Sequence, residues 1–288
     1  MSNTITIEPN SISTQDLHQL LLTAIAPRPI AFASTVDIEG NINLSPFSFF
    51  NVFSANPPIL VFSPSRRVRD NTTKHTLENL KEVPECVINI VNYAMVQQVS
   101  LSSCEYPKDI NEFTKAGFTQ IPSDLVAPPR VAESLIQLEC TVAQIIALGE
   151  KAGAGNLVLA EIKKIHIAES VLNANNKIDQ AKLDLVARLG GDWYARINEQ
   201  NLFEVTKPNT QLGMGFDDLP KFIRDYAGLT SNEKAQLANC TTVPASLTQN
   251  ENDNIQLVPA SIEGIKLELA NNNAQNAWTI IEKSTSHQ

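Results

Sequence analysis

The sequence lacks most features that mark a metalloprotein, a membrane protein or a disulfide-rich secreted protein. It has only four histidines, and its four cysteines (Cys86, Cys104, Cys140 and Cys240) are far apart and form no C-x-x-C pair, so no metal site is expected. No apolar run approaches the ~18 residues that cross a bilayer, and the N-terminus has no basic-then-apolar signal pattern. These absences predict a cytoplasmic protein with reduced thiols and no membrane contact.

Positive charge is scarce, and so are the common catalytic and nucleotide-binding motifs. Lys and Arg number 22 against 31 Asp and Glu, a net charge of −9, which argues against nucleic acid as a partner. The chain contains no Walker A sequence, G-x-S-x-G elbow or H-E-x-x-H helix. The glycines at 149, 153 and 155 have the wrong order for a dinucleotide fingerprint, so a Rossmann domain is disfavoured.

Residues 27–171 carry the strand signals. Short apolar runs alternate with turn residues, and apolar residues at 136, 138, 140 and 142 alternate with polar ones. Residues 157–167 repeat this alternation, and the Gly-containing segment 149–155 is typical of a hairpin connection between the two. The pattern favours a mainly β barrel or sandwich with subsidiary helices at 73–82, 94–102 and 111–116.

The composition changes after Pro208. Asn and Gln make up 16 of the 80 residues from 209 to 288. Residues 219–226 have a helical pattern, and Thr230 with Glu233 forms a capping box that predicts a second helix. We therefore expect one domain at 1–207 and a helical, Asn/Gln-rich extension at 208–288.

One short segment concentrates the positive charge of this acidic chain. Arg66, Arg67, Arg69 and Lys74 lie within nine positions, after a buried strand ending at Phe62 and directly before a predicted helix. Cationic side chains, hydroxyls and the free N–H groups of a helix start together suit a phosphate monoester. An exposed loop whose arginines pair with surface carboxylates explains the same composition equally well.

A second segment, residues 43–54, alternates small hydroxyl residues with phenylalanines. Pro46 interrupts its strand pattern. Such a segment can present backbone groups to the edge of a flat heterocycle while aromatic side chains enclose it. Taken alone, it is also typical of a core strand with four phenylalanines.

Seven stretches occur in a distinctive order: 27–35 (PRPIAFAST), 37–51 (D-x-x-G-x-x-NLSPFSFFN), 57–63, 74–80 (KHTLENL), 128–134 (PPRVAES), 138–140 (LEC) and 188–196 (RLGGDWYAR). In this order they resemble the flavin reductase-like family of FMN-binding split-barrel proteins over about residues 15–207. The resemblance implies a mainly β, Greek-key split barrel with peripheral helices. It also implies non-covalent FMN and a homodimer.

The resemblance also assigns site residues. It implies that the isoalloxazine and ribityl chain lie against Ser45, Pro46, Phe47, Ser48, Phe49, Phe50 and Asn51. The FMN phosphate would bind Ser63, Lys74 and Thr76, with Arg67 or Arg69 assisting. Relatives commonly have Lys-Asp-Thr where this chain has Lys74-His75-Thr76, and His caps a helix poorly. Thr72 or Thr73 could serve as the cap instead.

For several other residues the sequence leaves two roles open. His166 lies in an alternating strand, where it either faces the flavin or makes a structural hydrogen bond. Arg188, Tyr194 and Arg196 either close over the site or anchor their own Gly-containing loop, and Arg28 is a further substrate or loop candidate.

The resemblance implies an oxidoreductase that passes electrons from NADH or NADPH through FMN to free flavin, a partner oxygenase or another acceptor. We assign no catalytic acid or base, because hydride transfer needs none. Two alternatives stay open: an FMN electron carrier that another protein reduces, and a flavin-binding module whose C-terminal extension recruits a partner.

Overall fold

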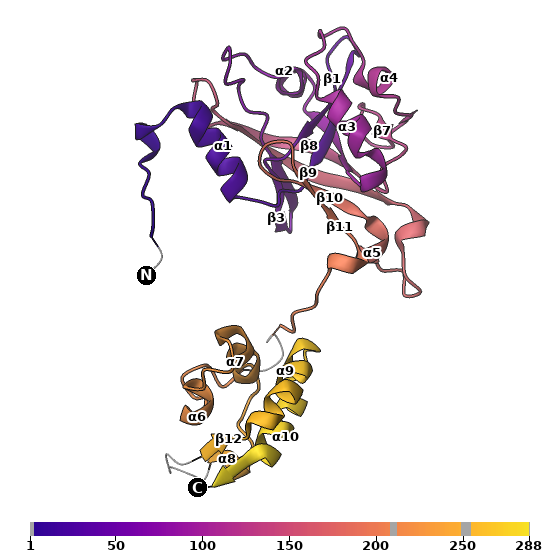
Figure 1. The fold of residues 1–288 in the computed structure, drawn as a ribbon. Coiled ribbons are helices and arrows are strands. Elements are labelled where there is room, and N and C mark those ends of the chain that lie inside the picture. The colour runs from indigo at the N-terminus through magenta and orange to yellow at the C-terminus, as the bar shows by residue number, and fades with distance from the viewer. Residues whose placement is uncertain (1–2, 208–211, 249–254, 288) are drawn as a thin grey trace. The chain divides into compact units, whose positions relative to one another are not determined.

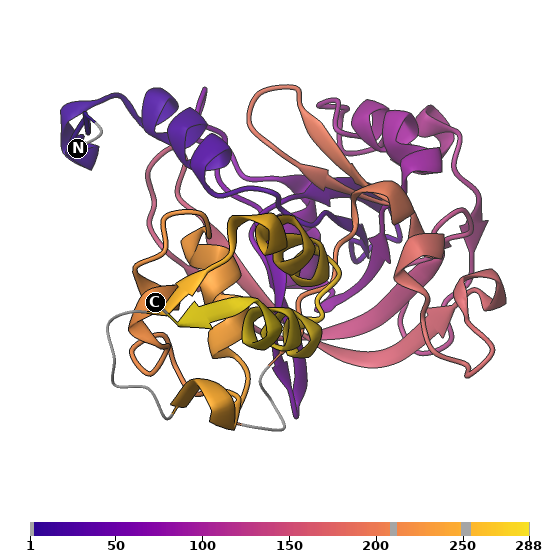
Figure 2. The same cartoon turned by 60° about the horizontal axis from the view of Figure 1, so that its bottom comes forward.

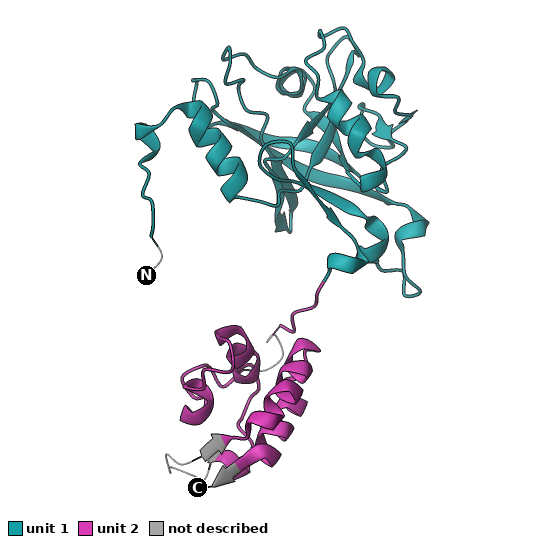
Figure 3. Cartoon of the chain, viewed as in Figure 1, with its two compact units in different colours: residues 1–202 teal, residues 203–288 magenta. Residues whose placement is uncertain are grey.

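The computed structural model describes residues 3–207, 212–248 and 255–287. The chain forms two compact units, residues 1–202 and 203–288 (Figures 1 and 3). Each unit has a hydrophobic core of its own. No helix among the described residues is long and apolar enough to cross a membrane.

Unit 1 is built on a seven-stranded antiparallel sheet (Figure 1). Its strands, in sheet order, are β2 (Ile42–Phe47), β1 (Ala31–Val36), β5 (Glu85–Ile90), β8 (Ile136–Ala147), β9 (Asn156–Ile167), β4 (Pro58–Phe62) and β3 (Phe50–Ala55). Two short ribbons accompany it, β6 (Gln120–Ile121) with β7 (Arg130–Val131), and β10 (Leu185–Arg188) with β11 (Tyr194–Ile197). Around it lie helices α1 (Thr14–Ala24), α2 (His75–Glu82), α3 (Val96–Ser102), α4 (Glu112–Ala116) and α5 (Gln180–Leu183).

The connection between β2 and β3 determines the shape of this sheet. The two strands are its opposite edges, yet only Ser48 and Phe49 separate them in the chain. Because a link of this length spans at most ~11 Å between the strand ends, the sheet must roll until its edges approach each other. β2 and β3 form no ladder with each other, so the result is a split barrel, as the sequence predicts.

The predicted hairpin β8–β9 is present, and Leu138, Cys140 and Val142 of β8 pack on the core, but the intervening Gln137 and Glu139 are buried as well. Cys140 packs in the core at 0% exposure opposite Cys86 of β5. The connection 149–155 turns back against the segment after β4, where Arg66 N donates to Ala154 O (2.9 Å). A Cβ at Gly155 would come within 2.8 Å of Ser63 Oγ, so any side chain there would push that hydroxyl aside.

Arg28 ties three distant segments of unit 1 together. Its guanidinium is 6% exposed and donates to the carbonyl oxygens of Leu22, Ile25 (2.8 Å) and Leu189 (3.0 Å), and to Ser48 Oγ (3.3 Å). The first two carbonyls belong to the C-terminal end of α1, which carries partial negative charge. One side chain thereby joins α1, the β2–β3 connection and the β10–β11 loop.

Unit 2 is mainly helical. Its elements are α6 (Lys221–Arg224), α7 (Ser231–Ala238), α8 (Ala245–Thr248), α9 (Ile262–Ala270) and α10 (Ala274–Ser284), with the ribbon β12 (Ile255–Leu257) and β13 (Thr285–His287). The predicted capping box is present, since Glu233 N donates to Thr230 Oγ1 and Thr230 N donates to the Glu233 carboxylate. Helices α9 and α10 pack side by side (Figures 1 and 2) around Trp278, which is 1% exposed and donates to Leu237 O (3.1 Å).

We predict that Arg28→Met destabilises unit 1 by about 2–4 kcal/mol, because buried carbonyl acceptors lose their donor. Chemical denaturation of the full chain, followed by far-UV circular dichroism, measures the change. Arg69→Met is the matched control, since that side chain is 74% exposed and its loss should leave the free energy of unfolding nearly unchanged. Equal stability of the two variants would contradict the role assigned to Arg28.

Candidate functional site

Unit 1 contains a cavity of about 520 Å³ where the barrel is split. Five segments line it: His18, Leu22 and Arg28; residues 45–49; Ser63, residues 65–69 and Lys74; Ser103 and Glu105; and Arg188 with Leu189. The two segments singled out in the sequence, one cationic and one rich in phenylalanine, therefore share one cavity.

The cationic segment is arranged around Glu105. Arg67 Nε lies 2.9 Å and Arg69 Nη2 2.7 Å from its carboxylate oxygens, and Lys74 Nζ lies at 3.9 Å. The hydrogen bond from Arg69 is the main reason that the pKa of Glu105 lies below its usual value. These cations pair with a surface carboxylate, as the second interpretation predicts, and they also line the cavity. Phosphate binding by this segment stays a prediction.

Burial and like charge both act on Lys74. Its pKa is lowered first by burial and then by the neighbouring Arg67, while Glu105 opposes the shift. Lys74 is also the residue immediately before α2. Neither Thr72 nor Thr73 caps this helix, and the sequence expectation of a Thr cap is wrong. The Thr72 hydroxyl bonds to Asp70 and the Thr73 hydroxyl to Glu78 instead.

Two serines complete this part of the wall. Ser63 Oγ accepts a hydrogen bond from Asn156 N (3.1 Å). Ser65 Oγ is buried and has no hydrogen-bond partner among the described residues. A buried hydroxyl without a partner is costly, and an anion in the cavity would supply one. This orphaned hydroxyl, beside four cations, fits a phosphate group.

The opposite wall comes from the end of β2 and its connection to β3. Residues 45–49 line the cavity, and Phe47 packs against Phe62 in the core beneath it. The ring of Phe49 meets His18 edge-on at 6.1 Å. The pKa of His18 is lowered by burial and then by Arg28, so this wall is apolar with a neutral imidazole at neutral pH.

Three predicted site residues do not line the cavity. Thr76 is 1% exposed, and its hydroxyl donates to Asn43 Oδ1 (2.5 Å). Asn51 is exposed and accepts a hydrogen bond from Val52 N (2.8 Å). Phe50 packs against the barrel core. The structure therefore brings Ser63, Lys74, Arg67 and Arg69 together without Thr76.

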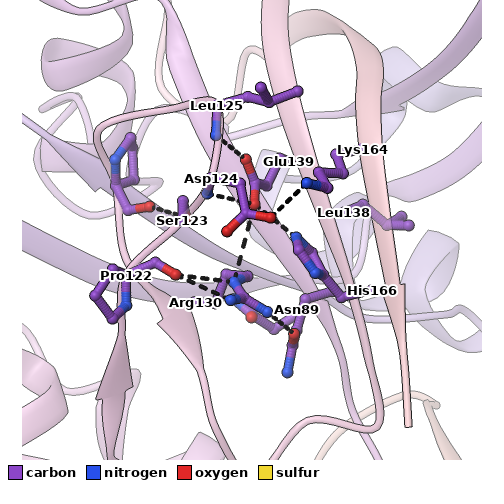
Figure 4. Close-up of polar contacts among 12 residues, drawn as sticks. Asn89, Pro122, Ser123, Asp124, Leu125, Arg130, Leu138, Glu139, Lys164 and His166 are labelled. Carbon is purple, nitrogen blue, oxygen red and sulfur yellow. Dashed lines mark hydrogen bonds and ion pairs between the residues drawn. The ribbon is translucent and has the colours of Figure 1, made fainter. Parts of the chain in front are cut away.

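His166 also lies outside the cavity, in a polar cluster around Glu139 (Figure 4). Its Nε2 is 2.6 Å from Glu139 Oε1, and the Glu139 oxygens also accept the backbone N–H groups of Asp124 (2.9 Å) and Leu125 (2.6 Å). Burial alone would raise the pKa of Glu139, but these hydrogen bonds outweigh it and lower the pKa. His166 therefore makes a structural hydrogen bond, the second of the two roles considered for it from the sequence.

The same cluster has the spacing of a metal site, since ligand atoms of Asp124, Glu139 and His166 lie within 4.8 Å of one another. However, the Lys164 ammonium pairs with Asp124, and Arg130 approaches Glu139 at 3.9 Å. Figure 4 shows both cations aimed at the carboxylates. The negative charge is thereby balanced by cations of the chain itself, and the cluster anchors residues 124–125 to the sheet.

The remaining candidates lie in or beside the cavity. Arg188 lines it and also lines a second cavity of about 350 Å³, whose wall includes Tyr194 and Arg196. Arg28 is the buried side chain described above. The pKa of Arg28 is lowered by burial and then by Arg188, which places two cations close together in this wall.

Sequence reasoning missed the contribution of α1, which supplies His18 and Leu22. A signal was present: Ser13 and Asp16 form the hydrogen-bonded start of that helix, with Asp16 N donating to Ser13 Oγ (3.0 Å). Glu105 was missed as well. Nothing local marks it, because it reaches the cationic segment from the loop after α3.

Unit 2 has a larger cavity, about 1030 Å³. Glu204 is the only charged side chain among its described lining residues, which are otherwise apolar groups and amides such as Gln236 and Asn272. Without a cation it does not suit an anionic cofactor, so the smaller cavity of unit 1 is the candidate site.

Comparisons with known proteins agree with this fold. The uncharacterized protein BH2278 of Halalkalibacterium halodurans is 36% identical over 204 residues, which cover 70% of this chain and 96% of that protein. Nitrilotriacetate monooxygenase component B from Bacillus cereus superposes with a TM-score of 0.66 at 31% identity, over 71% of this chain and all of that one. The 2-nitrobenzoate 2-nitroreductase NbaA of Pseudomonas fluorescens gives 0.63 at 25% identity, over 73% of this chain and all of that one.

Residues 23–182 match the profile of the flavin reductase like domain. That range includes the split between β2 and β3, the cationic segment and the β8–β9 hairpin, and it excludes unit 2. The chain belongs to the flavin reductase-like family of split-barrel proteins.

Proposed function

We propose that unit 1 binds FMN non-covalently in the 520 Å³ cavity and works as an NAD(P)H-dependent oxidoreductase. The observation that carries the proposal is the buried, partnerless hydroxyl of Ser65 beside Arg66, Arg67, Arg69 and Lys74 in one cavity. A phosphate there would accept hydrogen bonds from several charged donors at once, which is the strongest form of phosphate recognition.

The other residues of the cavity would orient the cofactor. Residues 45–49 present backbone and small side chains from the edge of a split sheet, and Phe49 and Leu22 exclude water. FMN, when bound, supplies the redox chemistry, taking electrons from a reduced nicotinamide and passing them to a second acceptor. Arg28 and Arg188 would add positive charge near the ring, which stabilises any negative charge that develops on it.

The relatives suggest acceptor classes. One similar structure is component B of a monooxygenase and another is a nitroreductase. For this chain we propose free flavin or a partner oxygenase as the acceptor, in the cytoplasm. The two rival functions, an electron carrier and a flavin-binding module, differ from this proposal in that neither reacts directly with a nicotinamide.

Reduction by a nicotinamide tests the proposal directly. The purified protein is expected to show the visible spectrum of an oxidised flavin and to release FMN on denaturation. Anaerobic stopped-flow mixing with NADH or NADPH should bleach that spectrum. An FMN-loaded protein that neither compound bleaches would exclude the reductase and favour the carrier.

Lys74→Ala should weaken FMN binding about ten- to over a hundred-fold, because a charge-assisted hydrogen bond contributes roughly 1.5–3 kcal/mol. Riboflavin, which has no phosphate, should lose much less affinity. Titration of the flavin-free protein, monitored by flavin fluorescence, measures both. Lys81→Ala, in the last turn of α2, is the control. Equal losses for the two flavins would show general disruption instead of phosphate recognition.

We also propose a homodimer, formed through the face that includes edge strand β3. Val52 and Phe53 are 63% and 70% exposed there, and an uncovered apolar edge strand is commonly paired by a symmetric partner.

Phe53→Asp should raise the dimer dissociation constant at least tenfold, since a charge would be buried in the interface. Sedimentation velocity at micromolar concentration measures it. Phe203→Asp in unit 2, at a phenylalanine that is 87% exposed, is the matched control. A wild-type monomer that retains FMN, or equal weakening by both substitutions, would contradict this interface.

A further inference from the structure

Unit 1 has a second cavity of about 350 Å³, which shares one lining residue with the candidate flavin site. Arg188 lines both cavities. The Arg188 backbone pairs with that of Arg28, and Gly190 lies so close to α1 that a side chain there would overlap Thr23. The position of Arg188 between the cavities is therefore held from both sides.

The Arg188 guanidinium has N–H groups that make no hydrogen bond with described residues. Its Nη1 donates to Trp193 O (3.3 Å), and its guanidinium stacks 4.5 Å from the centre of the Tyr194 ring. Among the described residues no carboxylate lies within 4.0 Å of Arg188 or of Arg28. Two neighbouring cations without an anion, one of them between two cavities, are suited to a phosphate-bearing ligand that extends from one cavity into the other.

The rest of the second cavity suits an adenosine group. Tyr93 contributes a ring, half of it exposed, over which Arg196 is fixed at 3.8 Å. Arg196 is itself held by Asp184 through two hydrogen bonds of 2.7 and 2.8 Å. Val96 and Val186 add apolar surface, and Gln97 and Ser100 add hydrogen-bonding groups. A base can stack on such aromatic and guanidinium planes.

Asp192 places a negative charge in the wall of the second cavity. Its carboxylate lines the cavity and has no ion pair with any described residue. A carboxylate at an adenosine site accepts hydrogen bonds from ribose hydroxyls and repels a 2′-phosphate. Of the two cations in this lining, Arg196 is paired with Asp184 and Arg188 is the one suited to the diphosphate, so Asp192 is the charge left for the ribose and favours a dinucleotide without that phosphate.

We propose that the second cavity binds the ADP-ribose half of the reduced nicotinamide donor, with Arg188 on its diphosphate and the base at Tyr93, and that it selects NADH over NADPH. This inference rests on the proposed function, because it assigns the residues that position the electron donor of the same site.

Binding of ADP-ribose tests the proposal without any redox step. ADP-ribose carries the diphosphate and the adenosine but no nicotinamide, and calorimetric titration of the protein gives its dissociation constant. Arg188→Met and Tyr93→Ala should each raise that constant at least tenfold. Tyr93→Phe keeps the ring and should bind ADP-ribose as the wild type does. Unchanged binding in both Arg188→Met and Tyr93→Ala would overturn the assignment.

Kinetics separate this inference from the proposed function. In Tyr93→Ala, the ratio of kcat/KM for NADH to that for 1-benzyl-1,4-dihydronicotinamide, which lacks the ADP-ribose half, should fall at least tenfold. Asp192→Asn should raise kcat/KM for NADPH relative to NADH at least fivefold, and Asp225→Asn in unit 2 should not. Unchanged ratios would overturn the assignment of the second cavity while leaving the proposed reductase function in place. Failure of both donors to reduce the flavin would instead overturn the reductase.

Discussion

The buried guanidinium of Arg28 is the contact on which the candidate site depends. It joins the end of α1, the β2–β3 connection and the β10–β11 loop, three segments that all line the candidate cavity. Burying a cation is costly unless hydrogen bonds replace its water. Here carbonyl groups and the negative end of a helix do so in place of a carboxylate. The positive charge is therefore stabilised without being neutralised, and its field still reaches into the cavity.

The same region is where the sheet fails to close. A link of two residues between opposite edge strands rolls the sheet into a barrel but leaves those edges without a shared ladder. Unpaired backbone groups at a sheet edge must find other partners. Residues 45–49 line the cavity, and β2 has β1 as its neighbour on one side only. The split thus provides hydrogen-bonding groups that a fully closed barrel would have used within its own sheet.

The sequence predicts what depends on neighbouring residues and misses what depends on distant ones. The β8–β9 hairpin, the capping box at Thr230 and the cationic segment before α2 are local patterns, and each is present. The placements of Thr76 and His166 depend instead on Asn43 and Glu139, which are far away in the chain. A hydroxyl or an imidazole suits a ligand and a buried hydrogen bond equally, and only the packing of the barrel decides between them.

Glu105 shows how an acidic chain keeps a cationic cavity ready for an anion. Its carboxylate gathers Arg67, Arg69 and Lys74, whose mutual repulsion would otherwise spread the loop. These ion pairs are partly exposed, with the Glu105 side chain at 42%, so each contributes little to stability. A phosphate deeper in the cavity would meet the same cations with less water around them, together with the partnerless hydroxyl of Ser65. Because charge-assisted hydrogen bonds strengthen as water is excluded, a phosphate bound there would compete with the Glu105 carboxylate for the same cations.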